Sequence, residues 1–243
     1  MTMRISEVSK RYGRGPLVLD RVTLDIAPGS FVCLLGASGC GKSTLLNLIA
    51  GLDTPSSGHI DRPSEGTAVM FQESSLMPWL SARRNVELAL RLRGVPRTER
   101  RSTALELLDS VNLAEAADKR PHELSGGMRQ RVALARALAQ DKPVLLMDEP
   151  FAALDAITRD LLHDELERVW RATGRTIVFV THNVREAARL GERIVLLGSR
   201  PGRVVQEWRT GMTSKRGIGA GGIEALAAEI TTRLRTEIRR NAA

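Results

Sequence analysis

The nine residues "GASGCGKST" at positions 36–44 constrain the fold more than any other stretch of this chain. They fit the pattern G-x-x-x-x-G-K-[ST], in which glycines let the backbone fold tightly and turn its N–H groups towards phosphate oxygens. The apolar run "FVCLLG" (31–36) is typical of a buried strand, and "KSTLLNLIA" (42–50) of a helix that stops at Gly51. Strand, loop and helix in this order predict a phosphate-binding loop in an α/β fold.

The loop supplies candidate contacts to the triphosphate of a nucleotide. Lys42 is expected to reach the β and γ phosphates, and the hydroxyl of Ser43 is expected to contact Mg²⁺. Because the backbone wraps the phosphates, all nine residues are candidates: Gly36, Ala37, Ser38, Gly39, Cys40, Gly41, Lys42, Ser43 and Thr44.

Strand and helix patterns alternate on both sides of a helical middle third. "VTLDIA" (22–27) alternates apolar and polar residues like a half-exposed strand. The middle third is expected to form helices at 86–93, 99–112 and 125–140. Later segments are expected to form strands at 143–150, 175–181 and 193–198 and helices at 158–173 and 184–190. The order predicts a mostly parallel α/β core with an inserted α-helical lobe.

Composition limits the class of protein. With 243 residues, 42% of them hydrophobic, the chain can bury a sizeable core, yet its apolar runs fall well short of a membrane span. The N-terminus "MTMRISEVSKRYG" lacks the apolar stretch of a signal peptide. Since Cys33 and Cys40 are its only cysteines, we expect a cytoplasmic protein without disulfides.

The excess positive charge lies mostly in the C-terminal tail. Of the net +8, the residues from 200 onward contribute nine Lys or Arg and four Glu, a net of +5. Nucleic acid, the anionic face of a membrane, or simply solvent could face this charge. Residues 211–222 are expected to form a linker before a basic amphipathic helix. "GIGAGG" (217–222) matches a dinucleotide fingerprint, but no strand leads into it, so a linker is the better interpretation.

Polar side chains follow the predicted strands at the edge where an α/β sheet holds its ligand. Asp148 suits a magnesium ligand, and Glu149 directly after it suits the base that takes a proton from attacking water. His182 follows the strand at 175–181 and could donate to the γ phosphate or the water. Gln72 follows a strand-like run and could contact Mg²⁺ or water.

A second anion-binding helix start follows in the middle third. "LSGGMRQR" (124–131) places Ser125, Gly126 and Gly127 where a helix begins, and free N–H groups at such a position favour anions. One phosphate loop does not need a second cradle, so this helix start requires another explanation.

The phosphate loop, Gln72, "LSGGM", "LLMDEP", "ALD" and "VTH" occur in one order that resembles the nucleotide-binding subunit of ATP-binding cassette (ABC) transporters. The resemblance spans about residues 3–205. It implies an ATPase domain at 1–210 and a separate tail at 211–243. Within the domain it implies a P-loop NTPase (RecA-like) core at 1–72 and 141–210, an N-terminal antiparallel β portion and an α-helical lobe at 73–140.

The resemblance also implies residue roles and partners. Tyr12 would stack on adenine, Gln72 would serve Mg²⁺ and catalysis, and Glu149 and His182 would be catalytic. Two copies would pair head to tail around two ATP molecules, so that Ser125 to Gly127 and Asp155 of one copy meet the nucleotide of the other. Two membrane-spanning permease subunits, and indirectly a substrate-binding protein, would be partners at the cytoplasmic side of the inner membrane. No nucleic acid is expected.

Two stretches narrow the resemblance. Residues 71–95 and 199–205 are similar to those of the nitrate, sulfonate and taurine importer group, although the cargo itself would not touch this chain. Leu76, Met77, Trp79 and Leu80 would line a groove for a permease helix, or would pack inside the helical lobe.

Two residues depart from the common pattern of the family, and two rival functions stay open. Met128 stands where Gln is usual, and Asn183 stands where Asp is common. One rival is a soluble ABC ATPase that acts on nucleic acid or ribosomes, and the other is a P-loop kinase. The single cassette and the presence of "LSGGM" argue against them.

Overall fold

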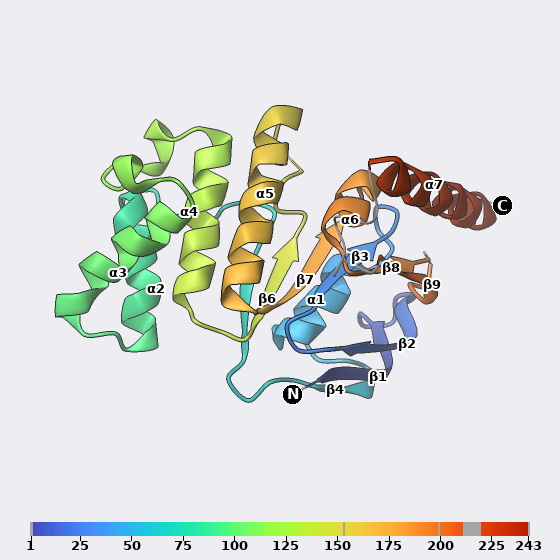
Figure 1. The fold of residues 1–243 in the computed structure, drawn as a ribbon. Coiled ribbons are helices and arrows are strands. Elements are labelled where there is room, and N and C mark those ends of the chain that lie inside the picture. Colours follow the sequence, from blue (N-terminus) through green and yellow to red (C-terminus); the bar gives the residue numbers. More distant parts are fainter. Residues whose placement is uncertain (1, 153, 199, 211–219, 243) are drawn as a thin grey trace. The chain divides into compact units, whose positions relative to one another are not determined.

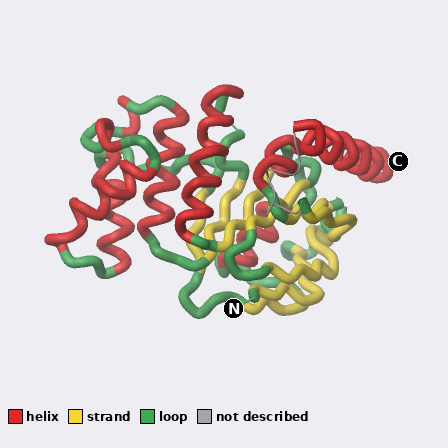
Figure 2. Tube along the Cα trace, in the orientation of Figure 1, coloured by secondary structure: helices red, strands yellow, loops and turns green. Residues whose placement is uncertain are grey.

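The computed structural model describes residues 2–152, 154–198, 200–210 and 220–242. The chain forms two compact units. Unit one comprises Met1–Gly66 and Arg175–Ala243, and unit two comprises Thr67–Gly174. Strands predominate in unit one and helices in unit two (Figure 2). No helix of the described ranges is long and apolar enough to span a bilayer.

An antiparallel sheet opens unit one, as expected for the N-terminal portion. Its central strand β1 pairs with β2 on one side and β4 on the other. In β2 the alternating pattern is confirmed, because Val22 and Leu24 are buried whereas Thr23 and Asp25 are exposed. The strands are β1 (Met3–Arg11), β2 (Leu17–Ile26) and β4 (Ser57–Asp61).

The second set of strands in unit one is mostly parallel. β3 lies between β7 and β8 and runs parallel to both, and β9 runs antiparallel to β8. All five residues of β3 are buried, which explains its unbroken apolar run. The strands are β3 (Phe31–Leu35), β7 (Thr176–Thr181), β8 (Arg193–Leu197) and β9 (Val204–Arg209).

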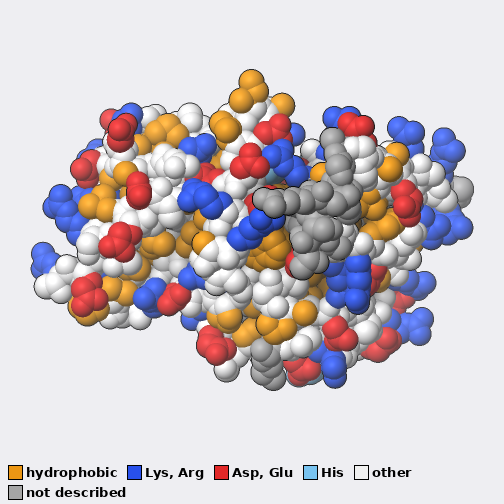
Figure 3. Space-filling model, viewed as in Figure 1, with side chains coloured by type: hydrophobic (Ala, Val, Ile, Leu, Met, Phe, Trp, Pro, Cys, Tyr) orange, Lys and Arg blue, Asp and Glu red, His pale blue; other side chains and the backbone are white. Residues whose placement is uncertain are grey.

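The described residues of unit one form three helices, α1 (Lys42–Ala50), α6 (Val184–Leu190) and α7 (Ala220–Ala242). Helix α7 lies beside α6 (Figure 1). It is anchored by Ile230, which is fully buried, and by the indole N–H of Trp208, which donates to Glu229 at 2.7 Å. Basic side chains gather where α7 ends (Figure 3), with Arg239 and Arg240 in its last turn.

The start of α7 corrects the expected linker. Residues 211–219 lie outside the described residues, but 220–222 are already helical, so the linker interpretation is wrong for those three. Two of them are glycines, which cost a helix about 1 kcal/mol each relative to alanine. Burial of Ile230 on the apolar face of the same helix opposes that cost.

Unit two, as far as its residues are described, contains a pair of parallel strands, four α-helices and two short 3-10 helices. The strands are β5 (Thr67–Met70) and β6 (Val144–Asp148). The helices are α2 (Ala82–Arg93), α3 (Arg97–Ser110), η1 (Ala114–Ala116), η2 (Pro121–Glu123), α4 (Gly126–Ala139) and α5 (Ala156–Thr173).

Two details of unit two differ from expectation. Helix α2 begins at Ala82 rather than at 86, because Ser81 accepts a hydrogen bond from the backbone N–H of Arg84 and caps an earlier turn. On α5 the side chains of Leu162, Leu166 and Val169 are buried and Trp170 is half-buried, but Leu161 is 55% exposed. The expected apolar side of α5 is therefore narrower than the sequence indicates.

Candidate functional site

In unit one, residues 36–41 form a tight loop between β3 and α1. Gly41 has φ 97°, and a Cβ there would lie 2.7 Å from the Cδ2 atom of Leu19. A Cβ on Gly36 would lie 2.6 Å from the Sγ atom of Cys40 and 2.7 Å from the carbonyl oxygen of Leu197. Both glycines are therefore required by the chain's own packing.

The Lys42 side chain lies inside this loop. It is only 5% exposed, and its Nζ donates to the carbonyl oxygens of Gly36 at 2.8 Å and Ala37 at 3.1 Å. The loop thus holds its cation at the site expected for phosphate. Helix α1 has neither a side-chain cap nor an acidic residue in its first turn, which favours an anion at its N-terminus, and Ser43 of that turn is exposed.

The strand register brings His182 to the same edge as the loop. Leu35 is paired with Thr181 in the parallel β3–β7 ladder. The loop begins at Gly36, directly after Leu35, and His182 directly follows Thr181, so both lie at the same edge of the sheet. The side chain of His182 is exposed. Asn183 caps α6, since its side-chain oxygen accepts from the backbone N–H groups of Arg185 at 3.0 Å and Glu186 at 3.4 Å. An amide caps a helix as well as a carboxylate does. Asn183 can therefore cap α6 in place of the Asp that is common at this position.

Unit two collects the predicted carboxylates and Gln72 at one strand edge. Asp148 ends β6, and Glu149 follows it with φ 43°, a left-handed conformation that is uncommon for a residue with a side chain. Because Met70 pairs with Met147, Gln72 follows β5 at the edge where Asp148 ends β6. The exposed Gln72 is held through its carbonyl oxygen, which accepts from Nε2 of Gln130 at 2.8 Å.

The predicted helix start at 125 is confirmed as the N-terminus of α4. Ser125 is the cap, and its hydroxyl accepts from the backbone N–H of Met128 at 3.2 Å. Gly127 is buried, and a Cβ there would lie 2.5 Å from the Cγ2 atom of Thr158. Gly126 is exposed, and among the described residues the nearest atom to an added Cβ would be Cδ2 of Leu154, 3.7 Å away. Packing among the described residues therefore explains Gly127 but not Gly126.

Asp155 and Tyr12, which were also predicted to contact a nucleotide, each form a hydrogen bond within the chain. Asp155 caps α5 by accepting from the backbone N–H of Thr158 at 3.0 Å, and this bond lowers the pKa of its carboxyl group. Tyr12 follows β1, is 51% exposed, and donates its hydroxyl proton to Asp53 at 3.0 Å.

The segment after Gln72 is held by hydrogen bonds to one residue that the sequence analysis missed, Asn85. Asn85 is fully buried in α2, where its side chain accepts from the N–H of Met77 and donates to the carbonyls of Met77, Leu80 and Ser81. Trp79 on this segment is 68% exposed, whereas Leu76, Met77 and Leu80 are partly buried. A buried amide on the apolar side of an amphipathic helix was the available signal.

The structure places the predicted residues in both units. The phosphate loop, Tyr12 and His182 belong to unit one, whereas Gln72, Asp148, Glu149, Ser125 to Gly127 and Asp155 belong to unit two. No group of three or more His, Cys, Asp or Glu side chains within the described ranges could hold a metal ion. Such a group is not needed for Mg²⁺ bound to a nucleotide, which keeps waters and phosphate oxygens as most of its ligands.

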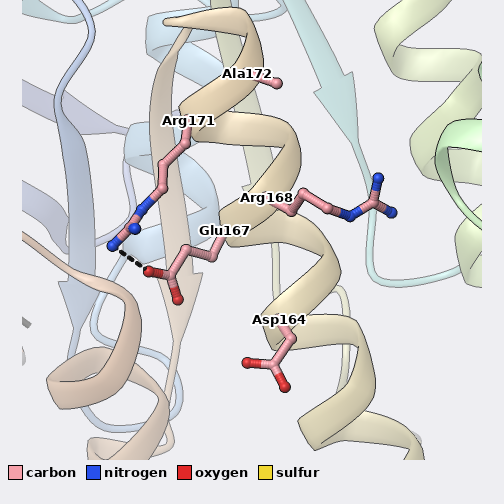
Figure 4. Close-up of a pocket in the computed structure, with 5 residues that line it drawn as sticks. All are labelled: Asp164, Glu167, Arg168, Arg171 and Ala172. Carbon is pink, nitrogen blue, oxygen red and sulfur yellow. Dashed lines mark ion pairs between the residues drawn. The ribbon is translucent and has the colours of Figure 1, made fainter.

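A hollow on α5 contains none of these residues (Figure 4). It is lined by Asp164, Glu167, Arg168, Arg171 and Ala172, all from one helix. Arg171 and Glu167 form an ion pair at 2.7 Å, while the Arg168 side chain points away from them. We assign no ligand to this surface.

Comparison with known proteins gives a consistent result. A family model described as "ABC transporter" matches residues 19–152. The Taurine import ATP-binding protein TauB of Rhizobium johnstonii is 50% identical over 202 residues, which cover 80% of this chain and 77% of that protein. The TauB of Chromobacterium violaceum is 46% identical over 224 residues, 86% of each chain.

Solved structures show the same likeness. The dimeric structure of MJ0796, a bacterial ABC transporter cassette, has a TM-score of 0.74 and 36% identity, and the match covers 86% of this chain and 98% of that one. A dimeric post-hydrolysis state of the same cassette bound to ADP and Pi has a TM-score of 0.73 at the same identity and coverage.

Proposed function

The chain belongs to the ATP-binding proteins of the ABC transporter family, an ATPase family, and we propose that it drives uptake of taurine or a related small anion such as another sulfonate or nitrate. The carrying observation is the 50% identity to a taurine import ATP-binding protein over most of both chains. The chain would lie at the cytoplasmic side of the inner membrane beneath two permease subunits, served indirectly by a substrate-binding protein. The exposed Trp79 and its neighbours would contribute to the permease contact.

The residue roles follow from the chemistry of phosphoanhydride hydrolysis. Lys42 and the N–H groups at the start of α1 bind the β and γ phosphates, and they stabilise the charge of the transferring phosphoryl group. Glu149 takes a proton from the attacking water. The water oxygen bonds to the γ phosphorus as the bond between that phosphorus and the β–γ bridging oxygen breaks, which releases ADP and phosphate. His182 and Gln72 orient the γ phosphate and the water.

Mg²⁺ is a proposed cofactor whose donors fit the residues present. The exposed hydroxyl of Ser43 and the carboxylate of Asp148 are oxygen ligands of the kind that Mg²⁺ prefers, and Gln72 offers an amide oxygen. When bound with ATP, the ion would neutralise charge on the β and γ oxygens.

The second helix start is proposed to serve the nucleotide of a second copy. Ser125 and Gly126 are exposed, and packing against the described residues gives no reason for a glycine at position 126. Close approach of a phosphate bound to a second copy would explain why position 126 is glycine. The solved MJ0796 cassette is itself a dimer. Asp155 would lie in the same contact. We also propose that the ATPase domain consists of a core at 1–72 and 141–210 and a helical lobe at 73–140.

The test is reconstitution of the chain with its permease subunits in vesicles. We expect ATP-dependent uptake of taurine or another sulfonate that stops in Glu149→Gln, together with accumulation of an ATP-bound dimer. Salt-sensitive binding to duplex DNA, with no effect of permease subunits on turnover, would instead support the nucleic-acid function.

A further inference from the structure

Lys10 and Asp53 form a cluster together with Tyr12, and the proposed mechanism assigns no role to Lys10 or Asp53. Lys10 lies near the end of β1, Tyr12 follows the strand, and Asp53 lies in the turn after α1. We call Lys10, Tyr12 and Asp53 the tyrosine cluster. All three belong to unit one.

Lys10 is unusual because its charge is buried. The residue is 7% exposed, and a buried ammonium is costly unless it is paired and hydrogen-bonded. Its Nζ donates to Oδ1 of Asp53 at 2.6 Å and to the carbonyl oxygen of Thr54 at 2.8 Å. The same Nζ lies 4.7 Å from the centroid of the Tyr12 ring, within the range of a cation–π contact.

Asp53 connects the other two members. Oδ1 accepts from Lys10 and from the backbone N–H of Thr54 at 2.7 Å, while Oδ2 accepts from the Tyr12 hydroxyl at 3.0 Å. The hydrogen bond from Lys10, followed by that from Thr54, lowers the pKa of this carboxyl group. Asp53 is therefore ionised at neutral pH and accepts all of these bonds.

The cluster fixes the Tyr12 ring at two points. The hydroxyl is held by Asp53 and one face lies against the Lys10 ammonium, yet the residue remains 51% exposed. A side chain that is ordered before binding loses less conformational entropy when a ligand arrives. A flat, half-exposed aromatic ring held in this way suits stacking with a base, and stacking of this kind tolerates different bases.

We propose that Lys10 and Asp53 are positioning residues that hold Tyr12 as a preordered platform for the base of the bound nucleotide. The proposal rests on the proposed function, to which we add the stacking of Tyr12 on adenine that the family resemblance implies. The cluster acts on affinity for the base and leaves the phosphate chemistry to Lys42 and Glu149. Because stacking does not read the edge of a base, ATP and GTP should depend on the cluster alike.

The experiment compares binding of Mg-ATP with binding of Mg-tripolyphosphate, which has the phosphates but no base. Lys10→Met and Asp53→Asn should each weaken ATP binding about 3- to 10-fold, with tripolyphosphate affinity unchanged. In steady-state turnover the KM for ATP should rise by the same factor while kcat changes by less than about twofold. Lys10→Arg, which keeps a cation and a donor, should recover most of the affinity.

Controls separate positioning from folding. Asp25→Asn removes an exposed ion pair of the same sheet, Arg4 Nε to Asp25 Oδ1 at 3.0 Å, and should change neither affinity. Equal weakening of ATP and tripolyphosphate by Lys10→Met would overturn the proposal, because the cluster would then act on the sheet or the phosphate loop. Unchanged ATP binding in both folded variants would also overturn it.

Tyr12→Ala distinguishes the proposal from its premise. If this variant loses about 10- to 100-fold in ATP affinity while Lys10→Met and Asp53→Asn lose none, only the positioning role fails. If Tyr12→Ala itself binds ATP normally, the adenine platform of the proposed function fails.

Discussion

The two helix starts that are proposed to bind phosphate, α1 and α4, are built in opposite ways. At α1 the cation Lys42 is buried, and Gly36 and Gly41 are required by contacts within the chain. At α4 Ser125 and Gly126 are exposed, and a Cβ on Gly126 would lie no closer than 3.7 Å to any described residue. The first is a complete cradle, whereas the second is a surface that the chain itself does not use. This difference supports two copies that each complete the other's site.

The largest expected effect is on the surface of α4. Ser125→Arg should reduce ATP hydrolysis at least about 100-fold, because a bulky cation would block close approach of a second copy. Binding of ATP to the single chain should stay within about twofold. Turnover assays and calorimetric titration measure the two quantities, and equal loss of both would place α4 in its own chain's site.

The cradle at α1 should respond in the opposite way. Lys42→Ala removes a buried charge-assisted donor and should weaken ATP binding roughly 10- to 100-fold. Calorimetric titration with Mg-ATP checks this affinity. Unchanged binding would remove Lys42 from the site.

The paired glycines of α4 sharpen the comparison further. Gly127→Ala should lower the free energy of unfolding by about 1–3 kcal/mol, since its Cβ would overlap Thr158. Gly126→Ala should leave stability within about 0.5 kcal/mol but reduce hydrolysis. Chemical denaturation and turnover of both variants provide matched measurements, and the reverse pattern would contradict the assignment of Gly126 to a partner.

The smallest effect concerns the strand that leads into the cradle. Burial, and secondarily the Glu186 carboxylate, raise the pKa of the Cys33 thiol well above 9.0. The folded chain then keeps a proton that the unfolded chain loses, so stability should fall by about 1.4 kcal/mol per pH unit above pH 9. In Cys33→Ala this fall in the free energy of unfolding with pH should be absent. Denaturation of both proteins from pH 8 to 10.5 tests it, and parallel curves would contradict it.

Sequence reasoning succeeded where a pattern is local and failed where contacts are distant. The buried run of β3, the loop after it and the helix start at Ser125 were all predicted, because each depends on neighbouring residues. Strand β4 was not predicted, since its first three residues are exposed and lie in a turn-like stretch. Lys10 gave no signal, because its partner Asp53 lies 43 positions away.

The exposure of Leu161 shows a second limit. It adjoins Leu162 in sequence, but consecutive residues on a helix point about 100° apart, so burial of Leu162 does not require burial of Leu161. Whether Leu161 is also buried depends on how α5 packs, and no local pattern decides that.

Mixing two inactive variants tests the shared site most directly. In a mixed dimer of Lys42→Ala and Ser125→Arg, the intact phosphate loop of one chain meets the intact α4 surface of the other, so one of two sites is whole. The account predicts that an equimolar mixture regains about a quarter of the wild-type hydrolysis rate, since about half of the dimers are mixed. A mixture as inactive as each variant alone would contradict it.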